Sequence, residues 1–453
     1  MRSTRLSLAF LAVLALVGAA QAPAAKPAGE SFFPRAGSHD YDVSDYLVRL
    51  AYEPRHGGRV SAIVRVTATA KRQLDGSFSL DFVGPRVTGV AVGGRAVEFD
   101  RDGAKLRVFP GRTIPKGTEF KVIVRYRGVP PKVTDPDGSQ EGWYPTDDGV
   151  IAVGEPQGTA AWIPCNNVPW DKASFYFEVD VPAGLRAVAN GRQEPVERSG
   201  NRARYTWWER APMSPYLALL DIGRGQIVKD RVGEVPTWTL VDPRLAGGSR
   251  GPLAQLPEVI RFESRLFGAY PFESAGSAVD YAPRLGYALE SQSRPIYAYV
   301  PDLTTIVHET AHQWFGDSVG LQRWPQIWLN EGFATWSEWY YAERHGGRSA
   351  HAIFQRLSGV PASDERFWNP PPARLGSPKQ LFDPTTYVRG AMALQALRQQ
   401  IGTRPFLRVL RRWTGGHRYG NATIGQFKAL AEEVSGRGLD NLFERWLYRR
   451  GKP

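Results

Sequence analysis

The chain has 453 residues, of which 42% are hydrophobic and 23% are charged, so it is long enough for two or three domains with ordinary apolar cores. Its formal net charge is +12, but the arginines are scattered rather than gathered in a run, which favours a basic soluble protein over one that binds nucleic acid. The single cysteine, Cys165, excludes an intrachain disulfide.

The start of the chain has the pattern of a secretory signal peptide. Arg2 and Arg5 precede the apolar run LSLAFLAVLALVG, and the sequence AQA that follows offers small residues at a cleavage site. The apolar run is too short for a comfortable membrane span. We therefore expect residues 1–22 to be a signal peptide and residues 23–39 a linker. The protein should be exported, to the periplasm or outside the cell, without stable membrane insertion.

Residues 40–235 read as one strand after another. Segments such as YLVRLAYE, RVSAIVRVTATA and EFKVIVRYRG alternate or run apolar, with glycine and proline between them. This pattern predicts an N-terminal antiparallel β domain of sandwich or saddle type.

The periodicity changes after residue 235. The segment LAQLPEVIRFESRLFGAYPF is an amphipathic helix that ends at Gly268 and Pro271, and further helical patterns such as TTYVRGAMALQALRQQIG and TIGQFKALAEEVSG follow. We expect residues 236–453 to form a mainly helical second domain, which makes the fold class α+β.

The apolar helix IVHETAHQWFG contains an HExxH motif. Residues four apart share one face of a helix, so His308 and His312 can point at one metal ion. Glu309 lies beside the first of them and is placed to act as general base on an attacking water. An HExxH by itself can also be an exposed helical face. Here the apolar setting and a suitably spaced glutamate favour metal catalysis.

A catalytic zinc usually has three protein ligands, so a third should come from elsewhere. Glu331 is the obvious candidate, because eighteen residues separate it from His312 and it lies in a second helical segment. Gly316 and Pro325 bracket a connection long enough to turn the chain back. Two antiparallel helices would then place Glu331 opposite the histidines.

The segments HETAHQWFGDSV and WLNEGFATWSE resemble those of the gluzincin zinc aminopeptidases, the family of aminopeptidase N and leukotriene hydrolase. The resemblance implies a thermolysin-like catalytic domain with one Zn²⁺ per chain, bound by His308, His312 and Glu331. Many members carry a large C-terminal helical domain, and the resemblance is to a short form without it. Glu338, farther along the same helix, is either an outer partner of the site or a solvated carboxylate.

Three more residues are implied by the same resemblance. GYALES is similar to the GAMEN motif, with Glu290 at the glutamate although Tyr, Leu and Ser replace Gly, Met and Asn. GEPQGTAAWIPCNN nominates Glu155 for the substrate amine, and TYVRGA nominates Tyr387 as oxyanion donor, with Arg389 in place of lysine. Outside the family context these would be a surface strand glutamate, an exposed loop acid and a helix packing residue.

The sequence therefore predicts a zinc-dependent aminopeptidase that hydrolyses N-terminal residues from peptides. Glu309 and Tyr387 would be catalytic, and Glu290 with Glu155 would bind the free N-terminus of the substrate. Peptides with a free N-terminus are the expected partners, and nucleic acid is not. Two alternatives stay open: a zinc endopeptidase with an open cleft, and a non-catalytic scaffold of the same fold.

Overall fold

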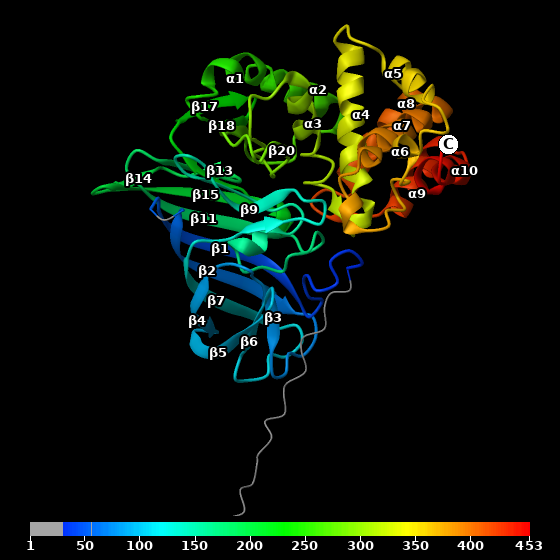
Figure 1. Ribbon diagram of the computed structural model, residues 1–453. Helices are drawn as coiled ribbons and strands as arrows, with labels where there is room; N and C mark the ends of the chain where they lie inside the picture. The colour runs from blue at the N-terminus through cyan, green and yellow to red at the C-terminus, as the bar shows by residue number, and fades with distance from the viewer. Residues whose placement is uncertain (1–29, 56) are drawn as a thin grey trace, which may run out of the picture.

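The computed structural model describes residues 30–55 and 57–453 (Figure 1). The expected signal peptide, residues 1–22, and the first part of the expected linker lie outside these described residues. Within the described ranges, no helix combines the length and the apolar character needed to cross a bilayer.

The N-terminal half is built on an eleven-stranded sheet with the order β13-β15-β11-β1-β2-β7-β4-β5-β6-β3, in which β14 also pairs with β15. Buried and exposed residues alternate along β1 and β2, as expected for strands with one face against a core. The strands are β1 (Tyr41–Glu53), β2 (Arg59–Ala70), β3 (Phe78–Asp81), β4 (Arg86–Val92), β5 (Arg95–Asp102), β6 (Lys105–Phe109), β7 (Glu119–Gly128), β11 (Ala173–Pro182), β13 (Arg192–Gln193), β14 (Glu197–Ser199) and β15 (Arg202–Met213).

The predicted N-terminal β domain is confirmed, with one difference in strand direction. All neighbours in the large sheet are antiparallel except β1 and β11, which run parallel. Parallel neighbours need a long connection between them. Here the connection between the two neighbours includes β2 to β7 of the same sheet and three strands of a second sheet.

The second sheet has five strands in the order β12-β16-β10-β9-β8. Its strands β10 and β16 are buried at every residue, so this part of the sheet lies inside the molecule. The strands are β8 (Lys132–Thr134), β9 (Gln140–Pro145), β10 (Val150–Val153), β12 (Arg186–Ala189) and β16 (Leu220–Gly223).

A third sheet, with the order β17-β18-β19-β21-β20, connects the two halves of the chain. The domain boundary expected at residue 235 falls within its β17–β18 hairpin. Strands β18 and β19 are parallel, and helices α1 and α2 form the connection between them. The elements are β17 (Gln226–Val232), β18 (Val235–Val241), α1 (Ala246–Leu253), α2 (Leu256–Phe267), β19 (Ala275–Val279), β20 (Ala288–Leu289) and β21 (Ile296–Tyr297).

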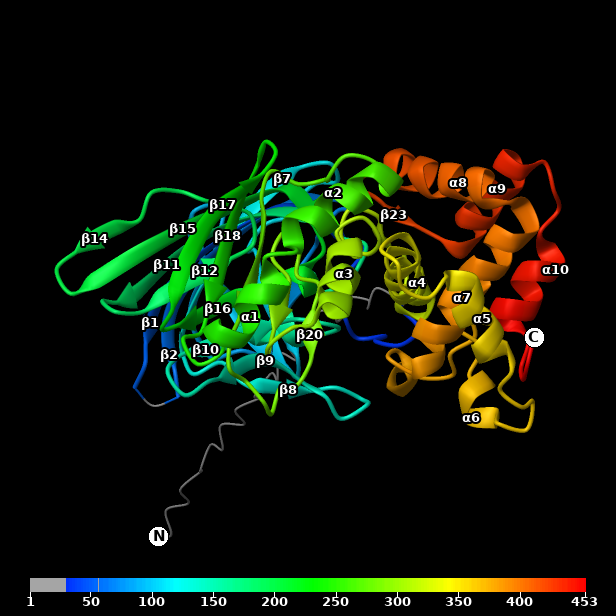
Figure 2. The ribbon, with the colours of Figure 1, turned by 90° about the horizontal axis from the view of Figure 1, so that it is seen from above.

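The remaining helices gather at the end of the molecule opposite β14, which confirms the predicted mainly helical second domain (Figure 2). A small two-stranded sheet of β22 and β23 ties the segment after α3 to the segment before α9. These elements are α3 (Leu303–Ala311), β22 (Gly320–Leu321), α4 (Trp328–Arg344), α5 (Ala350–Ser358), α6 (Glu365–Trp368), α7 (Pro384–Ile401), α8 (Thr403–Gly416), β23 (Asn421–Ala422), α9 (Ile424–Ser435) and α10 (Asp440–Phe443).

The second and third sheets pack against each other through a buried apolar cluster. Ile151 and Val153 from the second sheet, with Leu219 just before β16, meet Ala278 and Leu289 from the third. Because Leu289 ends β20 and directly precedes Glu290, this packing sets where Glu290 enters the site.

Candidate active site

Helix α3 presents the two histidines of the HExxH motif. The helix begins after Asp302, whose carboxylate accepts a hydrogen bond from the Thr305 backbone N–H and so caps the first turn. It ends at Ala311, so His308 lies in its last turn and His312 directly follows. Their ring centroids are 4.8 Å apart, so both imidazoles face the same space.

Glu331, in the first turn of α4, completes the group. Its Oε2 lies 3.3 Å from His308 Nε2 and 3.4 Å from His312 Nε2. Tetrahedral ligands at zinc distances of about 2.0–2.1 Å would lie about 3.3 Å from one another. The donor set and its spacing therefore fit a zinc ion, with a fourth position left for water or substrate.

The second nitrogen of each ring is also fixed. His308 Nδ1 lies 2.6 Å from Glu338 Oε1, and His312 Nδ1 donates to the Phe315 carbonyl at 3.0 Å. Such contacts hold the ring orientation and the tautomer in which Nε2 is free for a metal. Of the two interpretations of Glu338, the structure favours the outer partner over the solvated carboxylate.

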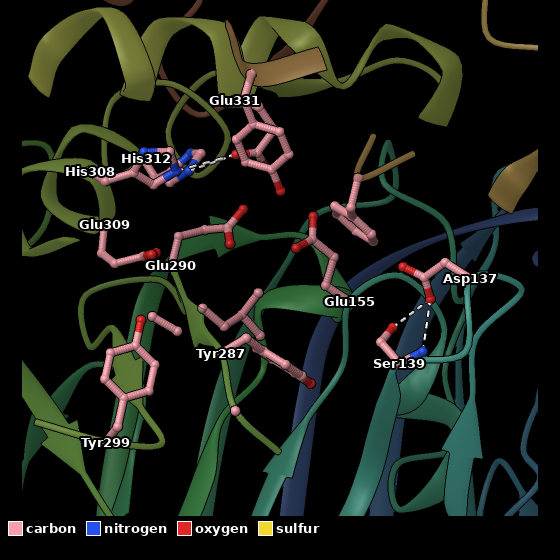
Figure 3. Close-up of a pocket in the computed structure, with 15 residues that line it drawn as sticks. Asp137, Ser139, Glu155, Tyr287, Glu290, Tyr299, His308, Glu309, His312 and Glu331 are labelled. Carbon is pink, nitrogen blue, oxygen red and sulfur yellow. Dashed lines mark hydrogen bonds and ion pairs between the residues drawn. The ribbon is translucent and has the colours of Figure 1, made fainter. Parts of the chain in front are cut away.

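Glu309 is buried beside this group, with 6% of its surface exposed. One of its carboxylate oxygens lies within 4.8 Å of an oxygen of Glu290 and a nitrogen of His312. Figure 3 shows the carboxylates of Glu309, Glu290 and Glu155 directed into the same space. Burial raises the pKa of Glu309 to about 7, while the nearby histidines lower it.

Tyr387 reaches the site from helix α7. Asp383 caps this helix by accepting a hydrogen bond from the Thr385 backbone N–H. The Tyr387 ring lies nearly parallel to that of His308, with centroids 6.1 Å apart. Burial, with repulsion from Glu331 and other acids, raises its pKa well above the usual value, so the phenol keeps its proton and can donate it in a hydrogen bond.

Helices α4 and α7 approach each other closely next to these groups. The backbone of Gly332, which follows Glu331, meets that of Gly390, so an added Cβ on Gly332 would lie 2.9 Å from a Gly390 backbone atom. Because neither residue has a side chain, the two helices can bring Glu331 and Tyr387 to the same cavity.

Glu155 and Glu290 form the opposite wall. Each has a buried Oε1 without a hydrogen-bond partner among the described residues. One oxygen from each lies within 4.8 Å of the other and of a Glu331 oxygen. Burial, followed by repulsion from Glu290, raises the pKa of Glu155 well above its usual value. Both residues are buried, so neither is the exposed acid of the alternative interpretations.

The segment that carries Glu290 is held from two sides. From the turn that follows α3, Gln313 donates to the Glu290 carbonyl at 2.8 Å and accepts from the Ser293 backbone N–H at 2.7 Å. From the β domain, Asn190 donates to the Gln292 carbonyl at 2.9 Å. The β domain therefore contributes directly to the position of the acidic wall.

All seven predicted site residues line one cavity of about 380 Å³ (Figure 3). Five other residues that line this cavity were not predicted from the sequence as site residues: Asp137, Ser139, Tyr287, Tyr299 and Phe382. Asp137 and Ser139 lie in the turn sequence DPDGSQ, which predicts a loop but no chemistry. The tyrosines and Phe382 carry no local signal that separates them from packing residues.

Arg389, which replaces the lysine of the family pattern, lies away from the cavity lining. It is fully buried and donates to backbone carbonyls of residues 368, 445, 446, 449 and 451. It therefore anchors the C-terminal segment to α7, the helix that carries Tyr387.

Comparisons with known proteins agree with this geometry. Residues 290–446 match the Peptidase family M1 domain. The chain is 26% identical over 414 residues to probable aminopeptidase 2 of Sulfurisphaera tokodaii, a match that covers 84% of this chain and 50% of the relative. It is 25% identical over 412 residues to leucyl aminopeptidase of Saccharolobus solfataricus, covering 83% of this chain and 50% of that protein. The chain thus spans about half the length of these curated relatives.

Solved structures match over a larger share. The crystal structure of an M1 zinc metallopeptidase from Deinococcus radiodurans has a TM-score of 0.85 and 29% identity, covering 94% of this chain and 98% of that one. A mutant of that protein bound to a Tyr-Ser-Ala substrate has a TM-score of 0.85 and 28% identity, with the same coverage. These matches confirm the predicted fold and agree with the predicted family resemblance.

Proposed function

We propose that the chain, which is similar to the M1 zinc metallopeptidases, is a zinc-dependent aminopeptidase that removes N-terminal residues from peptides. The observation that carries this proposal is the buried acidic wall of Glu155 and Glu290 beside the His308–His312–Glu331 group. The names of the relatives, and the peptide bound to the structural neighbour, support the same assignment.

His308, His312 and Glu331 would hold the zinc ion. When bound there, zinc supplies Lewis-acid polarisation of the scissile carbonyl and of the attacking water. The outer contacts to Glu338 and the Phe315 carbonyl keep both imidazoles oriented for that role.

Glu309 is the general base of the proposed reaction. Its carboxylate is buried between the histidines and Glu290, where a water attacking the scissile carbonyl would lie within its reach. It takes a proton from this water and then delivers the proton to the leaving amine.

Tyr387 is the proposed oxyanion donor. It reaches the cavity from α7, on a different element from the general base, and keeps its phenolic proton. A donor fixed before the reaction stabilises the negative charge that develops on the carbonyl oxygen.

Glu155 and Glu290 are the proposed receptors for the substrate α-ammonium. Two buried carboxylates with oxygens less than 4.8 Å apart can both accept from one ammonium group. Without a cation, their unpartnered oxygens carry a desolvation cost that an ammonium would offset. An endopeptidase would have no use for this charge, so the wall favours the aminopeptidase over the endopeptidase.

The decisive test compares a peptide with its N-acetylated form. Glu290→Gln should lower kcat/KM on the free peptide, because one partner of a buried charged pair is lost. The loss should correspond to about 2–5 kcal/mol of transition-state stabilisation. The low rate on the acetylated peptide should hardly change. Glu155→Gln should act in the same direction.

Glu234→Gln removes a fully exposed glutamate, with a side-chain exposure of 101%, and should leave both rates unchanged. If the wild type cleaves both peptides equally and Glu290→Gln treats them alike, the endopeptidase assignment replaces ours.

We propose in addition that the protein is exported. The support is the sequence of residues 1–22, with two arginines before an apolar run and small residues after it. N-terminal sequencing of the protein from the periplasm or medium should find a first residue near position 23. A mature protein that keeps Met1 would contradict export by signal cleavage.

A further inference from the structure

Four aspartates meet at the seam between the second and third sheets, outside the cavity described above. Asp148 lies in the turn between β9 and β10, and Asp221 lies in β16. Asp242 directly follows β18, and Asp280 directly follows β19. Figure 2 shows β10, β16 and β18 close together in this part of the molecule. Two of the aspartates thus come from each sheet.

Three of the four carboxyl groups lie close to one another, and the fourth, that of Asp221, lies beside Asp280. Asp148, Asp242 and Asp280 each offer an oxygen within 4.8 Å of the others. The Asp280 carboxyl also lies within hydrogen-bonding reach of both Asp221 and Asp242. Like charges at such spacing repel strongly unless a cation or a proton lies between them.

At the centre of the cluster, several carboxylate oxygens have no hydrogen-bond partner among the described residues. Asp221 is fully buried, and neither of its carboxylate oxygens has a hydrogen-bond partner there. The same holds for Asp280 Oδ2. Leaving such atoms buried and unpaired costs free energy, and a bound ligand would offset this cost.

Arg244 neutralises only the edge of the cluster. It pairs with Asp242 at 2.5 Å and with the exposed Asp147 at 2.6 Å, and its distance to Asp148 is 4.0 Å. With all four aspartates ionised, Arg244 would leave the group with a charge of −3. A divalent cation would reduce this to −1 and would use the unpartnered oxygens.

We propose that Asp148, Asp221, Asp242 and Asp280 form a second metal site, distinct from the zinc site, that binds a Ca²⁺ ion between the two sheets. Carboxylate oxygens are the ligands of hard cations, unlike the histidines of the zinc site. Ca²⁺ takes six to eight oxygen ligands in a flexible geometry, whereas Mg²⁺ dehydrates reluctantly and is rarely held by an all-protein cage. A largely buried group of four protein carboxylates therefore suits Ca²⁺ better.

The ion would link the β domain to the sheet that leads to Glu290. Asp148 and Asp221 belong to the second sheet, and Asp242 and Asp280 extend strands of the third. The site would thus stabilise the packing that positions the acidic wall. It does not depend on the proposed peptidase activity, because no residue of the cavity takes part.

Metal analysis of the full-length, zinc-loaded protein tests the proposal. After equilibrium dialysis against CaCl₂ the protein should contain one Ca²⁺ per chain in addition to zinc. At a Ca²⁺ concentration well above Kd, the Tm should rise by roughly 3–6 °C. The Asp280→Asn protein should keep its zinc but bind no Ca²⁺, and its Tm should not rise when Ca²⁺ is added. Asp147→Asn, which changes the exposed neighbour, should keep both the bound Ca²⁺ and the rise in Tm.

Three outcomes would overturn the proposal. One is a wild-type protein that takes up no Ca²⁺ and shows no Tm shift. Another is an Asp280→Asn protein that binds Ca²⁺ as the wild type does. The third is a wild type that is more stable than Asp280→Asn by the same margin with and without Ca²⁺, which would show that shared protons rather than the ion hold the cluster. If Asp280→Asn does not fold, the partly exposed Asp148→Asn replaces it, and the wild-type stoichiometry still decides.

Discussion

The crossing of α4 and α7 lets the effect of one methyl group be worked out from the structure. Gly332 directly follows Glu331, and Gly390 lies three residues after Tyr387. A Cβ added at Gly332 would lie 2.9 Å and 3.0 Å from two backbone atoms of Gly390, where ordinary contacts begin at 3.4 Å. Backbone atoms cannot rotate away, so Gly332→Ala should force the two helices apart by about 0.5 Å.

The magnitude follows from two opposing contributions. Overpacking costs about 1–3 kcal/mol, and alanine gains about 1 kcal/mol over glycine in helix propensity. The net change should be a loss of up to about 2 kcal/mol in stability. Because a misplacement of about 1 Å in an active site can cost about 100-fold, a shift of half that size between Glu331 and Tyr387 should lower kcat/KM on the order of 10-fold.

The assay is kcat/KM on an unblocked peptide, with the zinc content and Tm measured on the same sample. Gly415→Ala is the matched control, because Gly415 lies within α8 and an added Cβ would meet nothing within 4 Å. The control should gain about 0.5–1 kcal/mol and keep full activity. A Gly332→Ala protein as stable and active as this control would refute the idea that the close crossing positions the site.

Three further substitutions test individual groups. Glu338→Gln should weaken zinc binding by about 10- to 100-fold in a chelator titration, because His308 loses its charged partner. An unchanged zinc affinity would show that Glu338 is only a solvated carboxylate. Tyr387→Phe should lower kcat by roughly 100- to 1,000-fold with little change in KM, and a change in KM alone would assign Tyr387 to packing. Glu209 lies in β15 and accepts a hydrogen bond from Ser293 Oγ at 2.9 Å. Burial raises its pKa from 4.5 to about 7, so its stabilising effect is present below pH 4.5 and is lost as the pH rises through 7. Glu209→Gln should therefore gain stability relative to wild type between pH 5 and pH 8, by up to about 3 kcal/mol, and a pH-independent difference in the free energy of unfolding would contradict this.

Local patterns were enough to predict the fold class. The alternation in β1 and β2 predicted strands because it reflects one buried face, and the segment around Glu331 read as a helix from its own residues. The parallel pairing of β1 with β11 could not be predicted in this way. It depends on how the connection between them packs, which leaves no period in either strand.

Some residues of the candidate site could likewise be predicted from local sequence, and others could not. His308, His312 and Glu331 could be nominated because metal ligation restricts both residue type and spacing. Asp137, Phe382 and the Gly332–Gly390 contact come together only in the folded chain. The aspartates at the sheet seam are a similar case, since each one alone is an ordinary acid in a turn, within a strand or just past a strand end.

The products of a single digestion test the central claim most directly. Zinc-loaded wild-type protein is incubated with a short unblocked peptide and, separately, with its N-acetylated form, and the products are identified by mass spectrometry over time. We predict stepwise loss of single residues from the N-terminus of the unblocked peptide and hardly any change in the acetylated one. Internal cleavage of both peptides at equal rates would contradict the aminopeptidase assignment.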